Sequence, residues 1–270
     1  PDSDVVFALQ SADEGEATID LAALTFTSAN WDTAQTVTVT GVDDTLADGS
    51  QTTNITVSVN DDSSDNNFDA LNDQTYVATT TDNDTAAVTL SGTTATVTEA
   101  AGGGNTATFT VVLGVQPVGN VVVDLTANDA TESSVSPASL TFTTGNWNST
   151  QTVTITGVDD NIIDVDTEST ITVAVNDGSS EDNYDGVENQ TVTVTTTDDD
   201  SASFALSATS GTVTEGATTA TFTVVLGAQP NSDVVFDLAS LDTGEATVSP
   251  SSLTFTDGNW NSTQTVTDDS

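Results

Sequence analysis

Apolar and polar residues alternate one by one along several stretches of the chain. In residues 106–113, the apolar side chains of Ala107, Phe109, Val111 and Leu113 alternate largely with threonines. The same spacing gives apolar faces formed by Val153 and Ile155, by Ile171, Val173 and Val175, and by Val192 and Val194. A period of two is typical of strands with one face in a core and one in water. Threonine suits the wet face, because it is β-branched and uncharged.

This alternation predicts about seven strands between residues 86 and 200, counting the first two ranges as one interrupted edge strand. The ranges lie near 87–90, 94–98, 106–113, 120–126, 139–143, 150–157, 169–176 and 190–197. Asp, Asn, Gly and Ser cluster between them, where turns are needed. Short strands at this spacing, in a unit of about 110 residues, indicate a sandwich. The predicted fold class is all-β, with tandem immunoglobulin-like Greek-key β-sandwiches.

The sequence also repeats itself. The string Leu-Thr-Phe occurs three times and is followed each time by a tryptophan: Trp31, Trp147 and Trp260. The tryptophans are 116 and 113 residues apart. Around them the chain reads NWDTAQTVTVTGVDD, NWNSTQTVTITGVDD and NWNSTQTVT. Self-similarity at a fixed period indicates an array of similar structural units.

Three domains are predicted from these periods: a partial repeat without its first strands at 1–85, a complete repeat at 86–200, and a partial repeat without its last strands at 201–270. They are called the first, middle and third repeats below. The chain is interpreted as a segment of a longer periodic array. Completion of partial repeats between neighbouring chains is an alternative, although 1–38 and 230–267 duplicate the same strands and argue against it.

Composition narrows the chemistry. The chain has no Lys, Arg, His, Cys or Met, and its 42 acidic residues give a formal net charge of −42. Without imidazole, thiol or amine, the usual bases and nucleophiles are missing, so an enzyme is not expected. Nucleic acid is not an expected partner either, because phosphate binding needs Lys or Arg. The remaining oxygen ligands suit hard cations such as Ca²⁺, and self-repulsion favours bound cations.

The order of motifs resembles a known family. A Val-Thr-Glu string comes first, then Leu-Thr-Phe, then a Gln-Thr-Val strand running into Asp-Asp, an acidic loop and an Asp-rich triplet. This order resembles the Calx-beta repeat, the immunoglobulin-like calcium-binding module of sodium–calcium exchangers that recurs in large bacterial surface proteins and adhesins. The resemblance implies calcium binding at one end of the sandwich, near the junction with the next domain.

The resemblance also implies a set of calcium ligands. The early glutamate corresponds to Glu99 and Glu215, the strand end to Asp43, Asp44, Asp159 and Asp160, the acidic loop to Asp48 and Asp164, and the closing string to Asp82, Asp84, Asp198, Asp199 and Asp200. The family usually has Asp-Tyr where Glu16, Glu132 and Glu245 lie, so their role is left open. The first repeat lacks the early glutamate and the third lacks both loops. Only the middle repeat is therefore expected to form a whole site.

Physical chemistry is consistent with such a site. Ca²⁺ takes six to eight oxygens, which loops deliver readily. Like charges a few ångströms apart cost about 1–4 kcal/mol per pair at moderate dielectric. The site is therefore expected to be loose without calcium and stiff with it. The alternative is that these acids are solvated turn residues that keep the protein soluble.

The predicted function is a structural or adhesive extracellular repeat segment, in a stalk, fibre or filament at the cell surface, stiffened by calcium at domain junctions. One alternative is a calcium-sensing module of a larger membrane protein. Another is a carbohydrate-binding surface module, although Trp147 is expected to cap the core rather than stack on a sugar. The expected partners are other copies of the chain or neighbouring repeats, with a cell-surface or glycan ligand as a further candidate. No apolar run in this segment is long enough to span a membrane.

Overall fold

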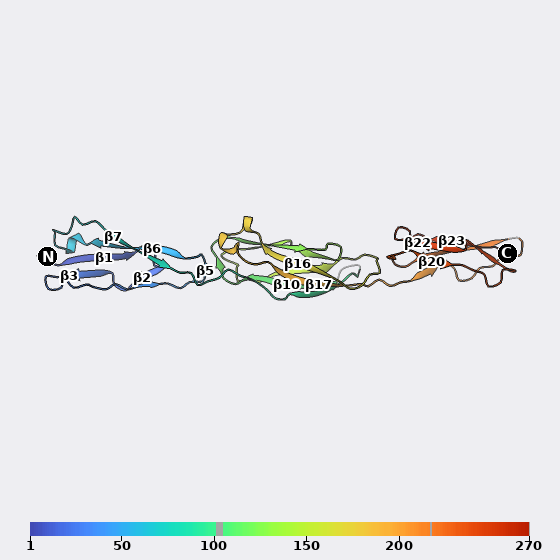
Figure 1. Cartoon of the computed structure of the whole chain (residues 1–270), viewed down its shortest axis with the longest axis horizontal. Coiled ribbons are helices and arrows are strands. Elements are labelled where there is room, and N and C mark those ends of the chain that lie inside the picture. The colour runs from blue at the N-terminus through green and yellow to red at the C-terminus, as the bar shows by residue number, and fades with distance from the viewer. Residues whose placement is uncertain (101–104, 217, 270) are drawn as a thin grey trace.

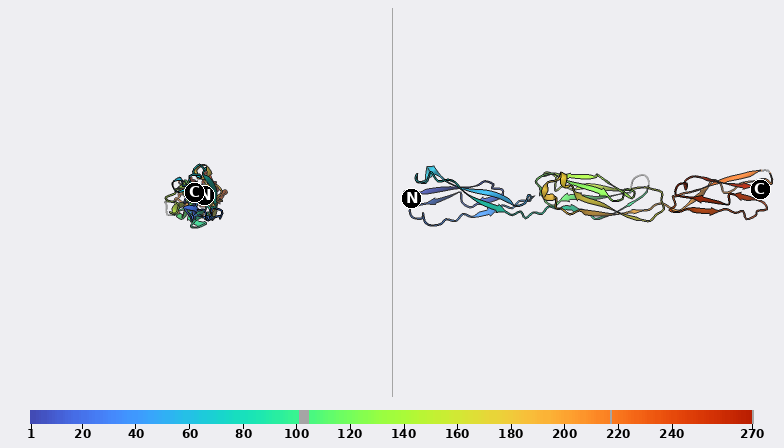
Figure 2. Two further views of the ribbon diagram at one scale, coloured as in Figure 1. Left: turned by 90° about the vertical axis from the view of Figure 1, so that its left-hand side faces the viewer. Right: turned by 45° about the horizontal axis from the view of Figure 1, so that its top comes forward.

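Three β-sheet units follow one another along a single axis in the computed structural model, which describes residues 1–100, 105–216 and 218–269. The two termini lie at opposite ends of this row (Figure 1). Seen end-on, the units superimpose in one narrow cross-section (Figure 2). Strands dominate every unit, so the all-β prediction is confirmed. Within the described residues, no helix is long and apolar enough to cross a membrane.

The middle repeat is a sandwich of two sheets. One sheet has the order β13 (Ser133–Ser136), β15 (Gln151–Gly157), β10 (Thr106–Leu113) and β8 (Val88–Leu90). The other has the order β14 (Ser139–Phe142), β12 (Val121–Ala127), β16 (Thr167–Val175), β17 (Gln190–Thr197) and β9 (Thr94–Thr98). Because β8 and β9 are edge strands of opposite sheets, they form the interrupted edge strand that the sequence predicts. Strand β13 was not expected.

The core lies between these two sheets and uses the alternating positions. The inward residues Phe109, Val111, Val153, Ile155 and Val192 are buried, while intervening threonines are exposed or half-buried. Of these, Val192 lies on β17 in the second sheet, where Val123 and Ile171 join the same cluster. The register predicted by the hydrophobic pattern is therefore confirmed, since a slip of one residue would turn these side chains to water.

The outer repeats hold fewer strands. In the first, one sheet has the order β3 (Ala23–Phe26), β1 (Val5–Ser11), β6 (Gln51–Val59) and β7 (Gln74–Thr80), and β2 (Ala17–Ile19) pairs with β4 (Val39–Gly41). In the third, one sheet has the order β18 (Phe204–Leu206), β19 (Thr219–Leu226), β23 (Gln264–Asp269) and β21 (Thr247–Ser249), and β20 (Val234–Asp237) pairs with β22 (Ser252–Phe255).

The remaining elements are short. They are the two-residue strands β5 (Leu46–Ala47) and β11 (Gln116–Pro117), and the 3-10 helices η1 (Asp61–Ser63), η2 (Asp177–Ser179) and η3 (Asp182–Tyr184). Strands β5 and β11 belong to different repeats and pair with each other in parallel.

A side-chain staple explains why the Asn-Trp phrase recurs. The Asn146 Oδ1 accepts hydrogen bonds from the Thr143 backbone N–H at 2.5 Å and from its hydroxyl at 3.2 Å. The Gln151 side chain donates to the Thr141 carbonyl at 2.8 Å. The corresponding bonds are present at Asn30 with Gln35 and at Asn259 with Gln264. The phrase therefore fixes the corner between two strands, which is a structural role.

The tryptophan beside this staple packs inward where its neighbouring strands are present. Trp147 and Trp260 contact the cores of their repeats, which confirms the capping role expected for Trp147. Trp31 is 62% exposed. The Trp147 carbonyl accepts a hydrogen bond from Leu113 of β10, and residues 1–85 contain no counterpart of that strand.

Replacing Tyr184 by Phe should destabilise the middle repeat. The Tyr184 side chain is fully buried, and its hydroxyl donates a 2.7 Å hydrogen bond to the Val115 carbonyl. Its loss should lower the free energy of unfolding by about 1 kcal/mol, the usual net value of such a bond. Urea unfolding measures the change. The matched control is Tyr76→Phe, because Tyr76 is 61% exposed. Equal midpoints for the two variants would contradict this role.

Candidate metal centre

Acidic residues gather at the end of the middle repeat that faces the third repeat. Strands β9 and β17 run parallel and reach this end side by side. Glu99 follows β9 directly, and Asp198 follows β17. The Glu99 backbone N–H donates to the Thr197 carbonyl at 3.1 Å, which holds the two chain segments together as they leave the sheet. Residues about a hundred positions apart are thereby neighbours.

Two loops complete the cluster. Glu132 lies in the turn between β12 and β13, and its carbonyl accepts a hydrogen bond from Val158 at 3.0 Å. Asp164 lies in the segment between β15 and β16. Carboxylate oxygens of Glu99, Glu132 and Asp164 all lie within 4.8 Å of one another, and so do those of Glu99, Asp198 and Asp200. We call these five residues the acidic centre; Glu99 belongs to both triads.

The acidic centre contains buried oxygens without a protein partner. Glu99 is 2% exposed and Glu132 is 7% exposed. One oxygen of each makes no hydrogen bond, and the same holds for one buried oxygen each of Asp164 and Asp200. A buried carboxylate with no partner costs several kcal/mol unless a cation compensates it. The donor set is therefore suited to a hard divalent ion, whose ligands are oxygens at short range.

The same burial raises the pKa of three carboxyl groups in the acidic centre. Burial, followed by the nearby carboxylates of Asp160 and Asp164, raises the pKa of Glu99 to about 7. Burial also raises the pKa of Glu132 and that of Asp200 above their ordinary values, again with help from neighbouring aspartates. Because no Lys or Arg is present in the sequence, no side-chain cation offsets this repulsion.

Not every acid predicted for the middle repeat joins the two triads. Asp160 lies close enough to raise the pKa of Glu99, but its Oδ1 accepts the Ile162 backbone N–H at 2.7 Å. Asp159 and Asp199 are exposed and belong to neither triad. Glu132, by contrast, belongs to one triad although its role was left open. The signal in the sequence was its match with Glu16 and Glu245 at the same place in each repeat.

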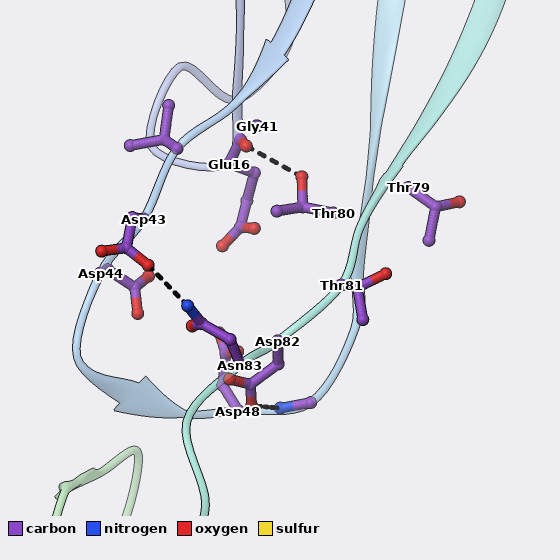
Figure 3. A pocket seen from close by; sticks show the side chains of 12 residues that line it. Glu16, Gly41, Asp43, Asp44, Asp48, Thr79, Thr80, Thr81, Asp82 and Asn83 are labelled. Atoms are coloured by element: carbon purple, nitrogen blue, oxygen red, sulfur yellow. Dashed lines mark hydrogen bonds between the residues drawn. The ribbon is translucent and has the colours of Figure 1, made fainter.

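The first repeat has a related but open arrangement. A cavity of about 320 Å³ is lined by Glu16, Asp43, Asp44, Asp48, Asp82 and Asn83 (Figure 3). The Asn83 side chain donates to Asp43 at 3.0 Å, and the Gly49 N–H donates to Asp82 at 2.8 Å. Backbone N–H groups lower the pKa of Asp82, whereas partial burial and neighbouring aspartates raise those of Glu16 and Asp84.

The acidic ends of the first and middle repeats differ because strand β9, which precedes Glu99 in the middle repeat, has no counterpart in residues 1–85. In the middle repeat, a Cβ on Gly157 would lie 2.2 Å from the Thr98 carbonyl oxygen, so only glycine allows this close approach. At the corresponding Gly41, the nearest atom to such a Cβ is a methyl group of Thr80 at 3.4 Å. Residues 1–85 contain no counterpart of Glu99. The described residues of the first repeat accordingly form no triad within 4.8 Å.

In the third repeat, Glu215 and Glu245 are exposed, and neither joins a triad within the described part of the chain. The two closing loops have no counterpart among residues 201–270. Among the described residues, the predicted metal ligands form triads within 4.8 Å only in the middle repeat, whereas those of the first repeat line an open cavity. Their role as ligands stays a prediction.

Comparisons with known proteins gave matches only among solved structures. No protein-family model and no curated protein matches the chain. Similar solved structures include domains 4 and 5 of the S-layer protein SbsC, with 18% identity over 71% of this chain and 70% of that one, at a TM-score of 0.33. Domains 1–6 of SbsC match 97% of this chain and 28% of that one, with 15% identity and a TM-score of 0.34.

CBD12 from CALX1.2 is also similar, with 17% identity over 63% of this chain and 72% of that one, at a TM-score of 0.32. These neighbours are β-sandwich domains, as this chain is. At such low identity and TM-score, the resemblance to the Calx-beta family stays a prediction.

The metal-free protein should lose stability as the pH rises. The folded pKa of Glu99 is about 7, above its ordinary value of 4.5. Its favourable contribution is therefore fully present below 4.5 and is lost as the pH rises through about 7. Thermal melts in metal-free buffer across this range measure the loss. Glu99→Gln should flatten the profile, whereas the exposed control Glu188→Gln should leave it unchanged. A Glu99→Gln profile as steep as that of the wild type would refute this assignment.

Proposed function

We propose that this chain is a calcium-binding structural segment of an extracellular repeat array, with its ion at the acidic centre between the middle and third repeats. The observation that carries the proposal is Glu99: a nearly fully buried glutamate, with one oxygen unpartnered, within 4.8 Å of two separate pairs of carboxylates. Natural proteins seldom bury such a group without a compensating charge.

Calcium suits the acidic centre better than other ions. The ligands are carboxylate oxygens from four separate segments, and sulfur and imidazole ligands do not occur in the sequence. Zinc, copper and iron prefer the missing ligands. Magnesium requires a near-ideal octahedron, whereas calcium accepts irregular sites of six to eight oxygens. The excess of carboxylates at one point therefore favours calcium.

A structural role fits the arrangement of the repeats. The three units form a narrow row (Figure 2), and both junctions carry acidic loops from the preceding repeat. Ions there would neutralise part of the −42 charge and fix the angle between units. We place the chain at the cell surface, where neighbouring repeats or other copies are its partners. This role is that of a stalk, fibre or filament of the kind in which Calx-beta-like repeats occur.

The proposal is tested by thermal melts in excess EDTA, in millimolar CaCl₂ and in equal MgCl₂. Calcium at 100 times its dissociation constant should stabilise the middle repeat by about 2.7 kcal/mol per site. Magnesium is the control for charge screening. Glu99→Gln should abolish most of the calcium-induced rise in midpoint, because it removes the carboxylate common to both triads.

Glu188→Gln is the matched control, since it removes the same charge from an exposed position outside the centre. It should retain the calcium response. Equal midpoints in EDTA, calcium and magnesium would overturn calcium binding. An undiminished response in Glu99→Gln would overturn the position of the site.

A further inference from the structure

Both junctions between repeats are made by a short extended segment inside an acidic loop, which is the strand β5 at the first junction and an isolated bridge at Ile162 at the second. At the first junction, β5 pairs in parallel with β11 of the middle repeat, so that Leu46 lies opposite Gln116 and Ala47 opposite Pro117. The Gln116 N–H donates to the Thr45 carbonyl at 3.1 Å. In Figure 1, β5 lies where the first repeat meets the middle one. The first repeat thus pairs a two-residue strand with one of its neighbour, so backbone hydrogen bonds cross the boundary between the repeats.

The second junction repeats this arrangement. Ile162 forms a parallel bridge with Gln229 of the third repeat. The Gln229 N–H donates to the Asn161 carbonyl at 2.6 Å, and its carbonyl accepts from Ile163 at 3.3 Å. The Asn231 side chain adds a 2.8 Å bond to the Ile163 carbonyl. Leu46 and Ile162 hold the same place in their repeats, as do Gln116 and Gln229, so the contact is a repeated feature.

The second residue of each segment contacts apolar side chains of the next repeat, with Ala47 buried and Ile163 half-buried. Ala47 is 2% exposed and belongs to the core cluster of the middle repeat. Ile163 lines a cavity of about 190 Å³ together with Leu226, Ala228 and Phe236 of the third repeat. Each junction therefore combines backbone pairing with burial of a side chain across the boundary.

The same loops are held by the acids of the preceding repeat. The Asp44 Oδ1 accepts the Leu46 N–H at 2.8 Å, and the Asp160 Oδ1 accepts the Ile162 N–H at 2.7 Å. Asp164, a member of the acidic centre, directly follows Ile163. The segment from Asp160 to Asp164 therefore has one side in the acidic end of its own repeat and the other in the next repeat.

We propose that Leu46–Ala47 and Ile162–Ile163 are docking strands whose partner is the Gln-Pro segment of the following repeat, and that calcium at the acidic centre holds the second docking strand in place. The calcium part rests on the proposed function. Without an ion, repulsion among Asp160, Asp164 and Glu99 pushes the loop away from the sheet end. With a bound calcium ion, Asp164 is drawn toward the acidic centre and Ile163 is held at the cavity of the third repeat.

A distance measurement across the second junction tests this. Because the chain has no cysteine, Thr191→Cys in the middle repeat with Thr221→Cys in the third gives a unique pair of exposed sites for spin labels. Calcium should convert a broad distance distribution into a narrow one, and magnesium at equal concentration should not. Calcium binding is measured separately by titration calorimetry on the same full-length variants.

Two variants loosen the docking strand without touching the acidic centre. Ile163→Asp puts a charge into the apolar cavity, and Asn231→Ala removes one surface hydrogen bond across the junction. Both should bind calcium yet lose the narrow distribution, completely for Ile163→Asp and in part for Asn231→Ala. Val165→Asp is the matched control, because it adds the same charge to the same loop at a 75% exposed position. It should keep the narrow distribution.

The outcomes separate the two proposals. Absence of calcium binding to the parent labelled chain would overturn the proposed function. Calcium binding with narrow distributions in Ile163→Asp and Asn231→Ala would overturn the docking strand and leave the metal centre intact. Equal broadening by Val165→Asp would also overturn it, because the effect would then be one of loop charge alone.

Discussion

Repulsion between carboxylates that no side-chain cation balances is the constraint on which this structure depends. Every charged side chain is acidic, and five of the carboxylates lie together at one end of the middle repeat. Several acids elsewhere accept backbone N–H groups, as Asp82 does from Asp84 and Gly49. Glu99 has no such partner for its second oxygen. The sandwich supplies the rigid frame, and in the proposed function an external cation supplies the missing charge.

The frame itself was predictable from the sequence, because period-two patterns and repeated turn phrases determine strands locally. All eight strand ranges predicted for the middle repeat contain a strand, and the predicted inward residues are buried except Ala107 and Val175, which are half-buried. The short strands β5 and β11 were not predictable, since two residues carry no periodicity and pair only across a repeat boundary. Strands were thus predicted correctly where the alternation within one segment determines them, and were missed where a strand forms only by pairing with a second repeat.

The acidic centre was predictable in part for a related reason. Glu99, Asp164, Asp198 and Asp200 were named from the family resemblance, and their carboxylates lie together, while their role as ligands stays a prediction. Glu132 could not be assigned, because a glutamate in a turn is usually solvated and only the fold reveals its burial. Conversely, the exposure of Asp159 and Asp199 depends on which side of the loop faces solvent. Sequence position determines at which end of the sandwich an acid lies, and side-chain direction determines which carboxylates lie close together.

The docking contact has a consequence for how such proteins can grow. The middle repeat carries its Gln-Pro receptor at one end and the docking segment at the other, so the complete interface is encoded within one period of the sequence. Duplication or deletion of a whole period therefore preserves every junction without any compensating substitution. Recombination can therefore change the number of repeats freely, whereas an insertion that is not a multiple of the period disrupts the contact between two repeats.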